Sequence, residues 1–124
     1  MDKAKLIGIA PQLVVNDVRI TAEYYRNVLG FKIIDYFLDP PVYAMVERDA
    51  FQIHFGKADS NSLNLNEDFR KGSTDLVIWV PNIETFFDEI KSRNCDIVQS
   101  IVKRVYGREF IIRDCDGHKI LVCD

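Results

Sequence analysis

The sequence contains an internal repeat, and this feature constrains the fold more than any other. Leu13–Val18 (LVVNDV) aligns with Ile78–Ile83 (IWVPNI) at an offset of 65 residues, and apolar positions in the following segment keep that offset. One copy cannot bury a helix face and both faces of a sheet, whereas two packed copies can. The repeat therefore predicts an α+β fold of two tandem βαβββ modules, with a curled mixed sheet around a concave cleft and the helices outside.

The first half of the chain has the pattern of a strand, a helix and three strands. Asn16-Asp17 is a natural N-cap, and Gly30 stands where a helix commonly ends in a left-handed residue. Pro11 lies inside the first predicted strand, where it favours an edge or a bulge. The predicted elements are a strand at Ile7–Val15, a helix at Val18–Leu29, and strands at Phe31–Leu38, Val42–Glu47 and Ala50–Phe55.

The second half repeats this order and ends in a hairpin. Asp116-Gly117 between two apolar-rich runs favours a hairpin, because glycine adopts a positive φ at no steric cost. The predicted elements are a strand at Thr74–Val80, a helix at Ile83–Asn94, a strand at Ile97–Val105, and hairpin strands at Glu109–Ile112 and Lys119–Cys123. We expect one domain over residues 1–124, with modules at about 1–56 and 74–124 and a polar linker or loop at 57–73.

Charge and hydropathy exclude several classes of protein. The formal net charge is −3 and the pI is about 5.4, without a Lys/Arg cluster, which argues against a nucleic-acid partner. No apolar run could span a bilayer and the N-terminal stretch lacks a signal-peptide core, so we expect a cytoplasmic protein without a membrane partner. The three cysteines (Cys95, Cys115 and Cys123) lack a Cys-x-x-Cys motif and fit reduced thiols better than disulfides or a zinc site.

Strand alternation predicts which residues face the cleft. The opposite face should be uniformly apolar and pack under the helices; it comprises Phe51, Ile53, Phe55, Leu76, Ile78, Ile120 and Val122. The cleft face mixes amide, aromatic, acidic and basic groups, as a site for a small amphiphilic molecule would. It comprises Gln12, Val14, Gln52, His54, Asp75, Val77, Trp79, Lys119 and Leu121.

Further residues extend this predicted site. Tyr43 and Tyr106 could add an aromatic wall for a planar ligand, while Trp79 fits either such a wall or the core. Arg108 could pair with an acidic group in the cleft or form a structural ion pair, and His118 is expected to be an exposed turn residue. The candidate ligand-binding residues are Gln12, Tyr43, Gln52, His54, Asp75, Trp79, Tyr106, Arg108 and Leu121.

Four segments carry a resemblance to a known family. They are Val15–Val18, Tyr24–Phe31, Gly107–Phe110 and Asp114–His118. The chain resembles the vicinal oxygen chelate superfamily, which includes glyoxalases, dioxygenases and bleomycin-resistance proteins, and it is closest to the bleomycin-resistance branch. Cys115 stands where that branch usually has proline. In that branch two subunits swap modules and form two clefts at their interface, so the resemblance implies a homodimer.

The resemblance also implies positions for a divalent metal, which the enzymes of this superfamily hold with His, Gln or Glu side chains. These positions are Ala10 (or Gln12 after a register shift), Asp75, Leu121 and His54, with Gln52 two residues from His54. Metal binding needs three or four converging lone-pair donors, and neither Ala10 nor Leu121 has one. We therefore expect no metal and no cofactor.

Three hypotheses about function follow. We favour a binding protein without catalytic residues, a metal-free dimer that sequesters a small amphiphilic molecule and confers antibiotic resistance of the bleomycin type. The alternative is a divalent-metal-dependent enzyme, a glyoxalase or dioxygenase relative that uses His54, Asp75 and Gln52. A scaffold or regulatory domain is the third, and it requires that side chains fill the cleft.

Overall fold

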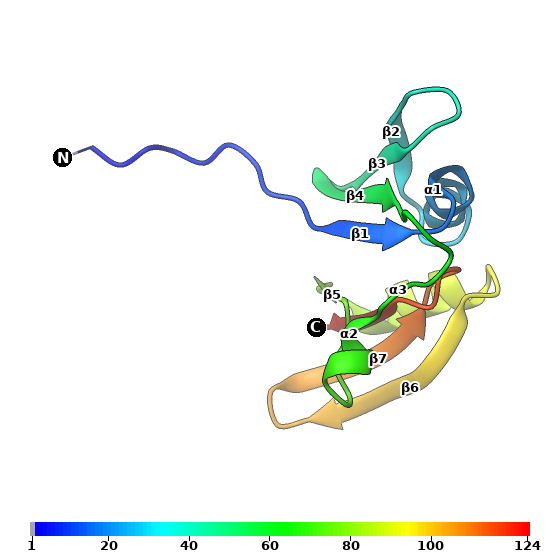
Figure 1. The fold of residues 1–124 in the computed structure, drawn as a ribbon. Helices are drawn as coiled ribbons and strands as arrows, with labels where there is room; N and C mark the ends of the chain where they lie inside the picture. The colour runs from blue at the N-terminus through cyan, green and yellow to red at the C-terminus, as the bar shows by residue number, and fades with distance from the viewer. Residues whose placement is uncertain (1) are drawn as a thin grey trace.

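The computed structural model describes residues 2–124, which form two βαβββ modules (Figure 1). The first module contains β1 (Gln12–Val15), α1 (Val18–Asn27), β2 (Lys32–Phe37), β3 (Tyr43–Arg48) and β4 (Phe51–Lys57). The second module contains β5 (Leu76–Trp79), α3 (Ile83–Lys91), β6 (Asp96–Arg104), β7 (Gly107–Arg113) and β8 (Lys119–Cys123). A short helix, α2 (Asn66–Phe69), lies between them in the sequence. The predicted α+β class with tandem modules is confirmed.

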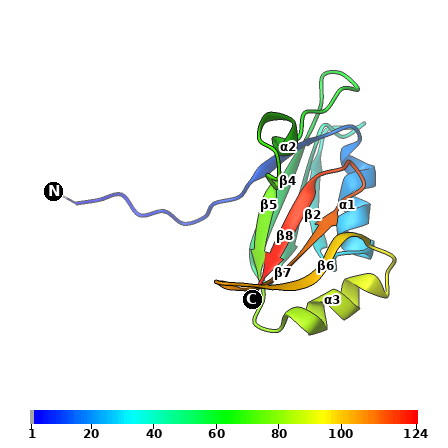
Figure 2. The same ribbon diagram turned by 90° about the horizontal axis from the view of Figure 1, so that it is seen from below.

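Each module carries one mixed sheet of four strands. The strand orders are β1-β4-β3-β2 and β5-β8-β7-β6, and Figure 2 shows β8 between β5 and β7. β1 runs parallel to β4 and β5 parallel to β8, while the other neighbours are antiparallel. The second module therefore repeats the topology of the first, and β1 and β5 are edge strands in their sheets.

Both module helices begin at the same point of the repeat. The Asp17 carboxylate caps α1 by accepting from the amides of Arg19 at 2.9 Å and Ile20 at 3.2 Å. Asn82, 65 residues later, caps α3 by accepting from the Thr85 amide at 3.2 Å. A side-chain oxygen in this position satisfies a free amide of the first helical turn. The offset predicted from the sequence is thus confirmed at the level of single residues.

Apolar residues from both modules form one core. α1 buries Val18, Ala22 and Tyr25, and α3 buries Ile83, Phe86 and Ile90. The Tyr25 ring packs against those of Phe31 and Phe55, at centroid distances of 5.7 and 4.8 Å. Residues at i, i+3, i+4 and i+7 share one helix face. The sequence predicted Phe87 on that face of α3 with Ile83 and Ile90, whereas Phe86 is the buried residue and Phe87 is half-buried.

Arg48 links the two modules. Its guanidinium donates to both carboxylate oxygens of Glu89 on α3, at 2.7 and 2.9 Å, and to the Leu29 carbonyl at 2.7 Å. It also lies over the Phe86 ring, 5.1 Å from the centroid. The paired hydrogen bonds between Arg48 and Glu89 give this contact a defined geometry. The neighbouring Gly30 has φ +74°, so it ends α1 in the left-handed conformation that its position predicted.

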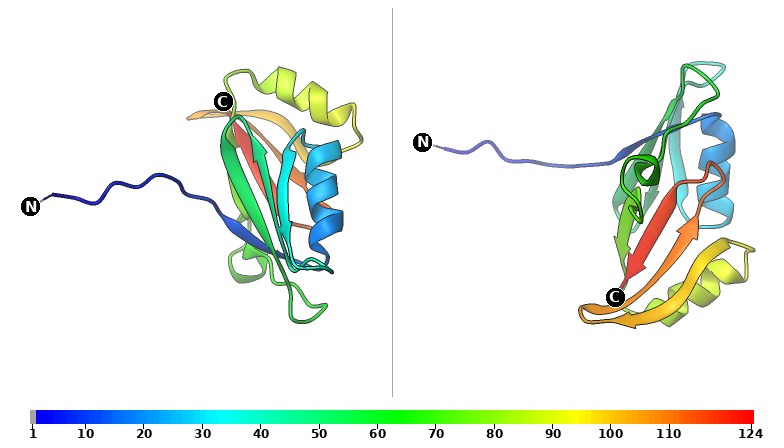
Figure 3. Two further views of the ribbon diagram at one scale, coloured as in Figure 1. Left: turned by 90° about the horizontal axis from the view of Figure 1, so that it is seen from above. Right: turned by 60° about the horizontal axis from the view of Figure 1, so that its bottom comes forward.

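The first strand is shorter than the predicted Ile7–Val15. β1 begins at Gln12, and residues 2–10, here called the N-terminal arm, extend away from the body of the protein in every view (Figures 1 and 3). Pro11 has no amide hydrogen to donate to a ladder, although its carbonyl accepts from the His54 amide at 3.0 Å. Pairing with β4 therefore stops at Pro11 instead of continuing to Ile7.

The segment between the modules is more ordered than a polar loop. β4 continues to Lys57, and α2 forms where the composition indicated no helix. Glu67 of α2 forms ion pairs with Arg113 at 2.9 Å and with Lys119 at 3.2 Å. The hydrogen bond from Arg113, followed by that from Lys119, lowers the pKa of the Glu67 carboxyl. Contacts with β7 and β8, which no local pattern reveals, thus fix α2 on the second module.

One residue of the apolar face that was predicted to pack under the helices is exposed instead. Phe51 is 77% exposed, whereas Ile53, Phe55, Ile120 and Val122 are buried as expected. β1 begins opposite His54 and so does not run beside the start of β4, which leaves Phe51 uncovered. Within residues 2–124 no helix has both the length and the apolar character needed to cross a membrane.

Candidate functional site

Four polar side chains on one face of the first sheet form a continuous hydrogen-bonded row, here called the polar chain. Gln12 Nε2 donates to the Tyr43 hydroxyl at 2.8 Å, and that hydroxyl lies 2.7 Å from His54 Nδ1. His54 Nε2 lies 2.8 Å from Gln52 Oε1. The ladder explains the proximity, because His54 is the register partner of Gln12 on β1 and of Met45 on β3. Four of the nine predicted site residues are therefore in contact.

The partners fix where the protons of the polar chain lie. A glutamine Oε1 can only accept, so His54 Nε2 carries the hydrogen and Nδ1 accepts from the Tyr43 hydroxyl. Every link then donates in one direction, from Gln12 through Tyr43 and His54 to Gln52. Within residues 2–124, Gln12 Oε1 and Gln52 Nε2 remain as an acceptor and a donor at the two ends. The row contains no carboxylate, lysine or arginine and can recognise a polar group at either end.

The corresponding face of the second sheet is apolar at its centre, with Arg113, Lys119 and Glu109 on the same face around it. Leu121 on β8 is the register partner of Val77 on β5 and of Ile111 on β7. Trp79 is 72% exposed, so the alternative that it belongs to the core is wrong. We call Val77, Trp79, Ile111 and Leu121 the apolar face. The sequence predicted three of its members and missed Ile111, which alternation along β7 could have identified.

Asp75 is engaged by the backbone. Its Oδ1 accepts from the Asn66 amide at 2.8 Å and its Oδ2 from the Lys119 amide at 3.0 Å. The carboxylate thus holds the start of α2 against β8. It is not among the residues of the polar chain, so the structure does not bring Asp75 together with His54 and Gln52.

Tyr106 and Arg108 also have partners within the second module. The Tyr106 hydroxyl donates to Glu109, and Arg108 pairs with Asp124 at 2.8 Å and with Glu84 of α3. The carboxylates of Asp124 and Glu84 raise the pKa of Arg108 above its ordinary value. Of the two interpretations of Arg108, the structural ion pair is the one that these contacts favour.

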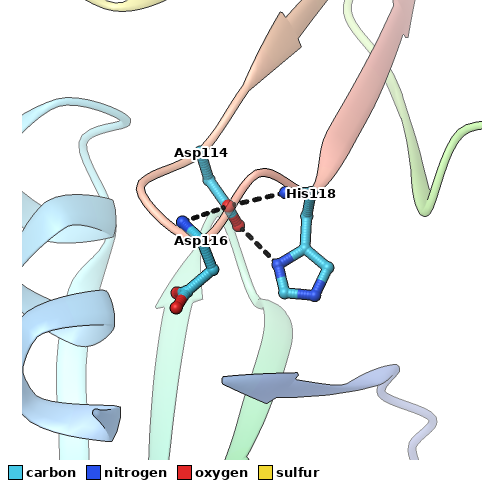
Figure 4. Close-up of side chains that lie close together, drawn as sticks. All are labelled: Asp114, Asp116 and His118. Carbon is cyan, nitrogen blue, oxygen red and sulfur yellow. Dashed lines mark hydrogen bonds and ion pairs between the residues drawn. The ribbon is translucent and has the colours of Figure 1, made fainter. Parts of the chain in front are cut away.

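The hairpin turn between β7 and β8 carries a buried polar cluster (Figure 4). Asp114 Oδ1 accepts from the amides of Asp116 and His118 at 2.9 and 3.0 Å. Its Oδ2 accepts from the Tyr25 hydroxyl of α1 at 2.7 Å and lies 3.1 Å from His118 Nδ1. Asp114, Asp116 and His118 are the one group of three potential metal ligands among residues 2–124. Because Asp114 already meets four donors, we interpret the cluster as structural.

His118 is buried, so the expectation of an exposed turn residue is wrong. Burial lowers the pKa of His118, but the hydrogen bond to Asp114 and nearby carboxylates outweigh it, and the net pKa is raised. Burial, followed by the charge of Asp114, holds the pKa of the Tyr25 hydroxyl well above its ordinary value. Tyr25 is thus a neutral donor that connects α1 to the hairpin. The partners are 89 residues apart in the chain, which is why local patterns did not reveal them.

The three cysteines are free, as the sequence predicted. Burial raises the pKa of the Cys95 and Cys123 thiols. Desolvation of the Cys115 sulfur, together with the negative charges of Asp116 and Asp114, raises the pKa of that thiol to about 12. A thiolate is the reactive form of cysteine, so none of the three is activated as a nucleophile.

The pair of His118 and Asp114 makes stability depend on pH. A histidine whose folded pKa is raised adds stability that is complete below its unfolded pKa of about 6.5 and is lost as pH rises through the folded value. We expect the His118→Gln substitution to lower the free energy of unfolding, and the loss relative to wild type to be larger at about pH 5.5 than at about pH 8.5. Urea unfolding at the two pH values measures this difference. An equal difference at both would contradict the assignment of a charged pair.

A groove of about 720 Å³ lies between the two modules. The start of β4 (Phe51, Gln52 and Ile53) forms one wall, and β5 with Trp79 forms another. The lining also includes Phe86 of α3, and Ile9 and Pro11 from the segment before β1. The sequence did not predict this groove, because its walls come from both modules and depend on how the modules pack together.

Comparison with known proteins identifies the fold. The family model described as the Glyoxalase/Bleomycin resistance protein/Dioxygenase superfamily matches residues 8–122. No curated protein matches the sequence.

Several solved structures are similar to the chain. The bleomycin-binding protein of Streptomyces verticillus, solved with copper(II)-bleomycin, has a TM-score of 0.73 and 19% identity, with 98% of each chain covered. A glyoxalase-related enzyme from Clostridium phytofermentans has a TM-score of 0.76 and 16% identity, covering 96% of this chain and 95% of that one. TioX from Micromonospora sp. ML1 has a TM-score of 0.73 and 16% identity, with coverage of 93% and 95%. At these identities the likeness shows the fold.

Proposed function

The chain belongs to the glyoxalase/bleomycin resistance protein/dioxygenase superfamily, and we propose that it is a homodimer that binds and sequesters a small amphiphilic molecule without a metal. The observation that carries this proposal is the polar chain. It is a row of hydrogen-bonded polar side chains on an open sheet face, and its end groups, Gln12 Oε1 and Gln52 Nε2, are available to a ligand. Binding sites typically combine a few such fixed polar groups with apolar walls.

The apolar wall would come from a second copy. Val14 beside the polar chain and Val77 and Trp79 on the apolar face are all exposed in one chain. Contiguous exposed apolar surface commonly marks an interaction site. A twofold dimer that sets the polar chain of each copy against the apolar face of the other would cover this surface and form two equal clefts. Each cleft would then be polar on one side and aromatic on the other, which suits an amphiphilic ligand.

The choice of probe follows from the comparisons. The Streptomyces verticillus protein, whose fold this chain shares, was solved with copper(II)-bleomycin, a large molecule with polar and planar aromatic parts. We therefore propose bleomycin, with and without copper, as the first ligand to test, in line with a role in antibiotic resistance.

The test uses the single tryptophan. Trp79 lies on the apolar face, so binding in the cleft should change its fluorescence. We expect saturable quenching by bleomycin and a rise in the thermal midpoint, because a ligand that binds only the folded state stabilises it. Neither quenching nor a thermal shift at saturating bleomycin would contradict the antibiotic-binding form of the proposal.

The alternative of a metal-dependent enzyme receives little support from the contacts. Both ring nitrogens of His54 are used within the polar chain, and both carboxylate oxygens of Asp75 accept backbone amides. A metal at His54 would have to displace Tyr43 or Gln52. The carboxylate nearest along the ladder on that face is Glu47, the register partner of Gln52, whereas Asp75 is already engaged and Leu121 has no donor atom. The residues present therefore do not match the ligand set that the enzymes of the superfamily need.

Elemental analysis tests this point directly. After incubation with zinc, nickel, manganese or iron and removal of free metal, we expect less than stoichiometric metal in the purified protein. His54→Ala should leave the metal content unchanged. Stoichiometric metal in wild type that is lost in His54→Ala would favour the enzyme and contradict the proposal.

A scaffold or regulatory domain would have its cleft filled by side chains. The groove of about 720 Å³ and the open polar chain do not suit that hypothesis. The volume is within the range of roughly 300–1,000 Å³ that is usual for ligand pockets.

A further inference from the structure

Two cationic side chains lie at one end of the apolar face. Lys119 precedes Leu121 by two residues on β8, and Arg113 follows Ile111 by two residues on β7. Strand alternation therefore places both cations on the same side of the second sheet as the apolar face. They are register partners, and their side chains are only 13% and 31% exposed. This end of the proposed cleft thus carries two partly buried positive charges.

Glu67 bridges the two cations. Its Oε1 accepts from Arg113 Nη1 at 2.9 Å and its Oε2 from Arg113 Nη2 at 3.4 Å, while Lys119 Nζ lies 3.2 Å from Oε2. Two N–H groups of one guanidinium that face two oxygens form the fork-like contact by which arginine recognises a carboxylate. Within residues 2–124, neither cation has another ion-pair partner. The two cations are therefore arranged to receive a single carboxylate.

The positions of both cations also depend on contacts that do not involve Glu67. Arg113 Nη1 donates to the Gly117 carbonyl at 2.8 Å. The Lys119 backbone is held by Asp75, whose carboxylate accepts from its amide at 3.0 Å. Donors that are fixed before binding reduce the conformational entropy that a ligand must remove. The two cations would thus stay side by side when Glu67 leaves.

The helix that carries Glu67 makes little apolar contact with the rest of the protein. α2 is four residues long and buries none of them, and its Phe69 is 78% exposed. The Asn66 amide donates to Asp75 at 2.8 Å, and Asn66 Nδ2 donates to the Thr74 carbonyl at 3.1 Å. Figures 1 and 3 show α2 beside the second sheet, where these polar contacts hold it. A segment with few buried apolar contacts opens at a low cost in free energy. A competing carboxylate could therefore displace Glu67 without disturbing the core.

We propose that Arg113 and Lys119 form a subsite for the carboxylate of a ligand, and that Glu67 fills this subsite until such a ligand displaces it. The inference rests on the proposed function and names a second class of ligand beside bleomycin, the aromatic carboxylates. The class is a carboxylate because the chain already holds one there by a planar contact at two points. The aromatic ring would lie on the adjacent apolar face, against Leu121 and its register partner Val77.

The probes are 2-naphthoate and its neutral amide, 2-naphthamide, which share a ring system and differ in charge at neutral pH. Isothermal titration calorimetry measures both affinities in wild type and in Glu67→Gln. The substitution removes the competing charge, so we expect 2-naphthoate to bind about tenfold more tightly than to wild type. The affinity for 2-naphthamide should stay within about twofold. Because α2 buries no residue, the variant should fold, which circular dichroism and cooperative urea unfolding would verify.

Two further variants locate the effect. Glu23→Gln is the matched control, since it is the same change at a half-buried residue of α1 that forms no ion pair within residues 2–124. Its affinity for 2-naphthoate should equal that of wild type within about twofold. Glu67→Gln/Lys119→Met keeps an unbranched apolar side chain at Lys119 but removes the positive charge. We expect this double variant to lose the tenfold gain.

Hydrogen exchange on wild type tests the displacement without a variant. The Asn66 amide donates to Asp75 and the Arg70 amide donates to the Asn66 carbonyl, so both report on α2. We expect saturating 2-naphthoate to speed their exchange and 2-naphthamide to leave it unchanged.

Three results would overturn the inference. The first is equal affinity of wild type and Glu67→Gln for 2-naphthoate, and the second is an equal gain for 2-naphthamide, which would indicate an apolar effect. The third is that wild type binds bleomycin while neither wild type nor Glu67→Gln binds 2-naphthoate; the proposed function would then stand without the subsite. If none of the three compounds binds, both the inference and the antibiotic-binding form of the proposed function fail.

Discussion

Replacing Asp114 by alanine is expected to lower the free energy of unfolding by about 3–5 kcal/mol. The buried carboxylate accepts from two amides of its own turn, from the Tyr25 hydroxyl and from His118. Alanine removes the acceptor and leaves the hydroxyl and the imidazole buried without a partner. Because Tyr25 belongs to α1 and Asp114 to the last hairpin, the loss also weakens the contact between the two modules. Urea unfolding at neutral pH measures the change.

Asp59→Ala is the matched control for this prediction. Asp59 is exposed and forms no ion pair within residues 2–124, so its removal should change stability by less than about 0.5 kcal/mol. If the two variants were equally stable, the hairpin cluster would not be the link between the modules that its hydrogen bonds indicate.

The second large effect is expected on binding. Tyr43→Phe removes the central link of the polar chain and leaves Gln12 without its acceptor and His54 Nδ1 without its donor. The row then no longer holds Gln12 and Gln52 in fixed positions for the ligand. A lost hydrogen bond of this kind weakens binding by about 10–100-fold. Isothermal titration calorimetry with bleomycin measures the affinity of the variant and of wild type.

Tyr106→Phe supplies the control, since it is the same chemical change at a residue that the sequence ranked equally with Tyr43. The Tyr106 hydroxyl donates to Glu109, outside the polar chain. We expect its affinity for bleomycin to stay within about twofold of wild type. A larger loss of affinity in Tyr106→Phe than in Tyr43→Phe would indicate that the ligand contacts the second sheet near Tyr106, and would contradict a role for the polar chain.

The sequence predicted the features that local chemistry determines. The N-caps Asp17 and Asn82, the left-handed Gly30 and the Asp-Gly hairpin each depend on a few neighbouring residues. Strand alternation likewise put Gln12, Gln52 and His54 on one face before any register was known. These predictions hold because propensity, periodicity and turn chemistry agree along the chain.

Features that depend on distant contacts escaped prediction. His118 is buried because α1 supplies Tyr25 above the turn, and α2 forms because Glu67 meets Arg113 and Lys119. The links of the polar chain depend on the register of β3 against β4 and of β1 against β4. Pro11 ends the ladder of the first strand, so only Gln12–Val15 of the predicted Ile7–Val15 forms a strand and residues 7–10 belong to the arm.

The measurement that tests the proposed function most directly is a count of binding sites in a mixed dimer. One chain carries Tyr43→Phe and the other carries Leu121→Arg, which puts a charge in the middle of the apolar face. Two different affinity tags isolate the heterodimer, and calorimetry with bleomycin counts its sites of wild-type affinity. If each cleft combines the polar chain of one copy with the apolar face of the other, one cleft carries both changes and the other carries neither. We therefore predict one site of wild-type affinity per heterodimer; finding none would contradict a cleft shared between two copies.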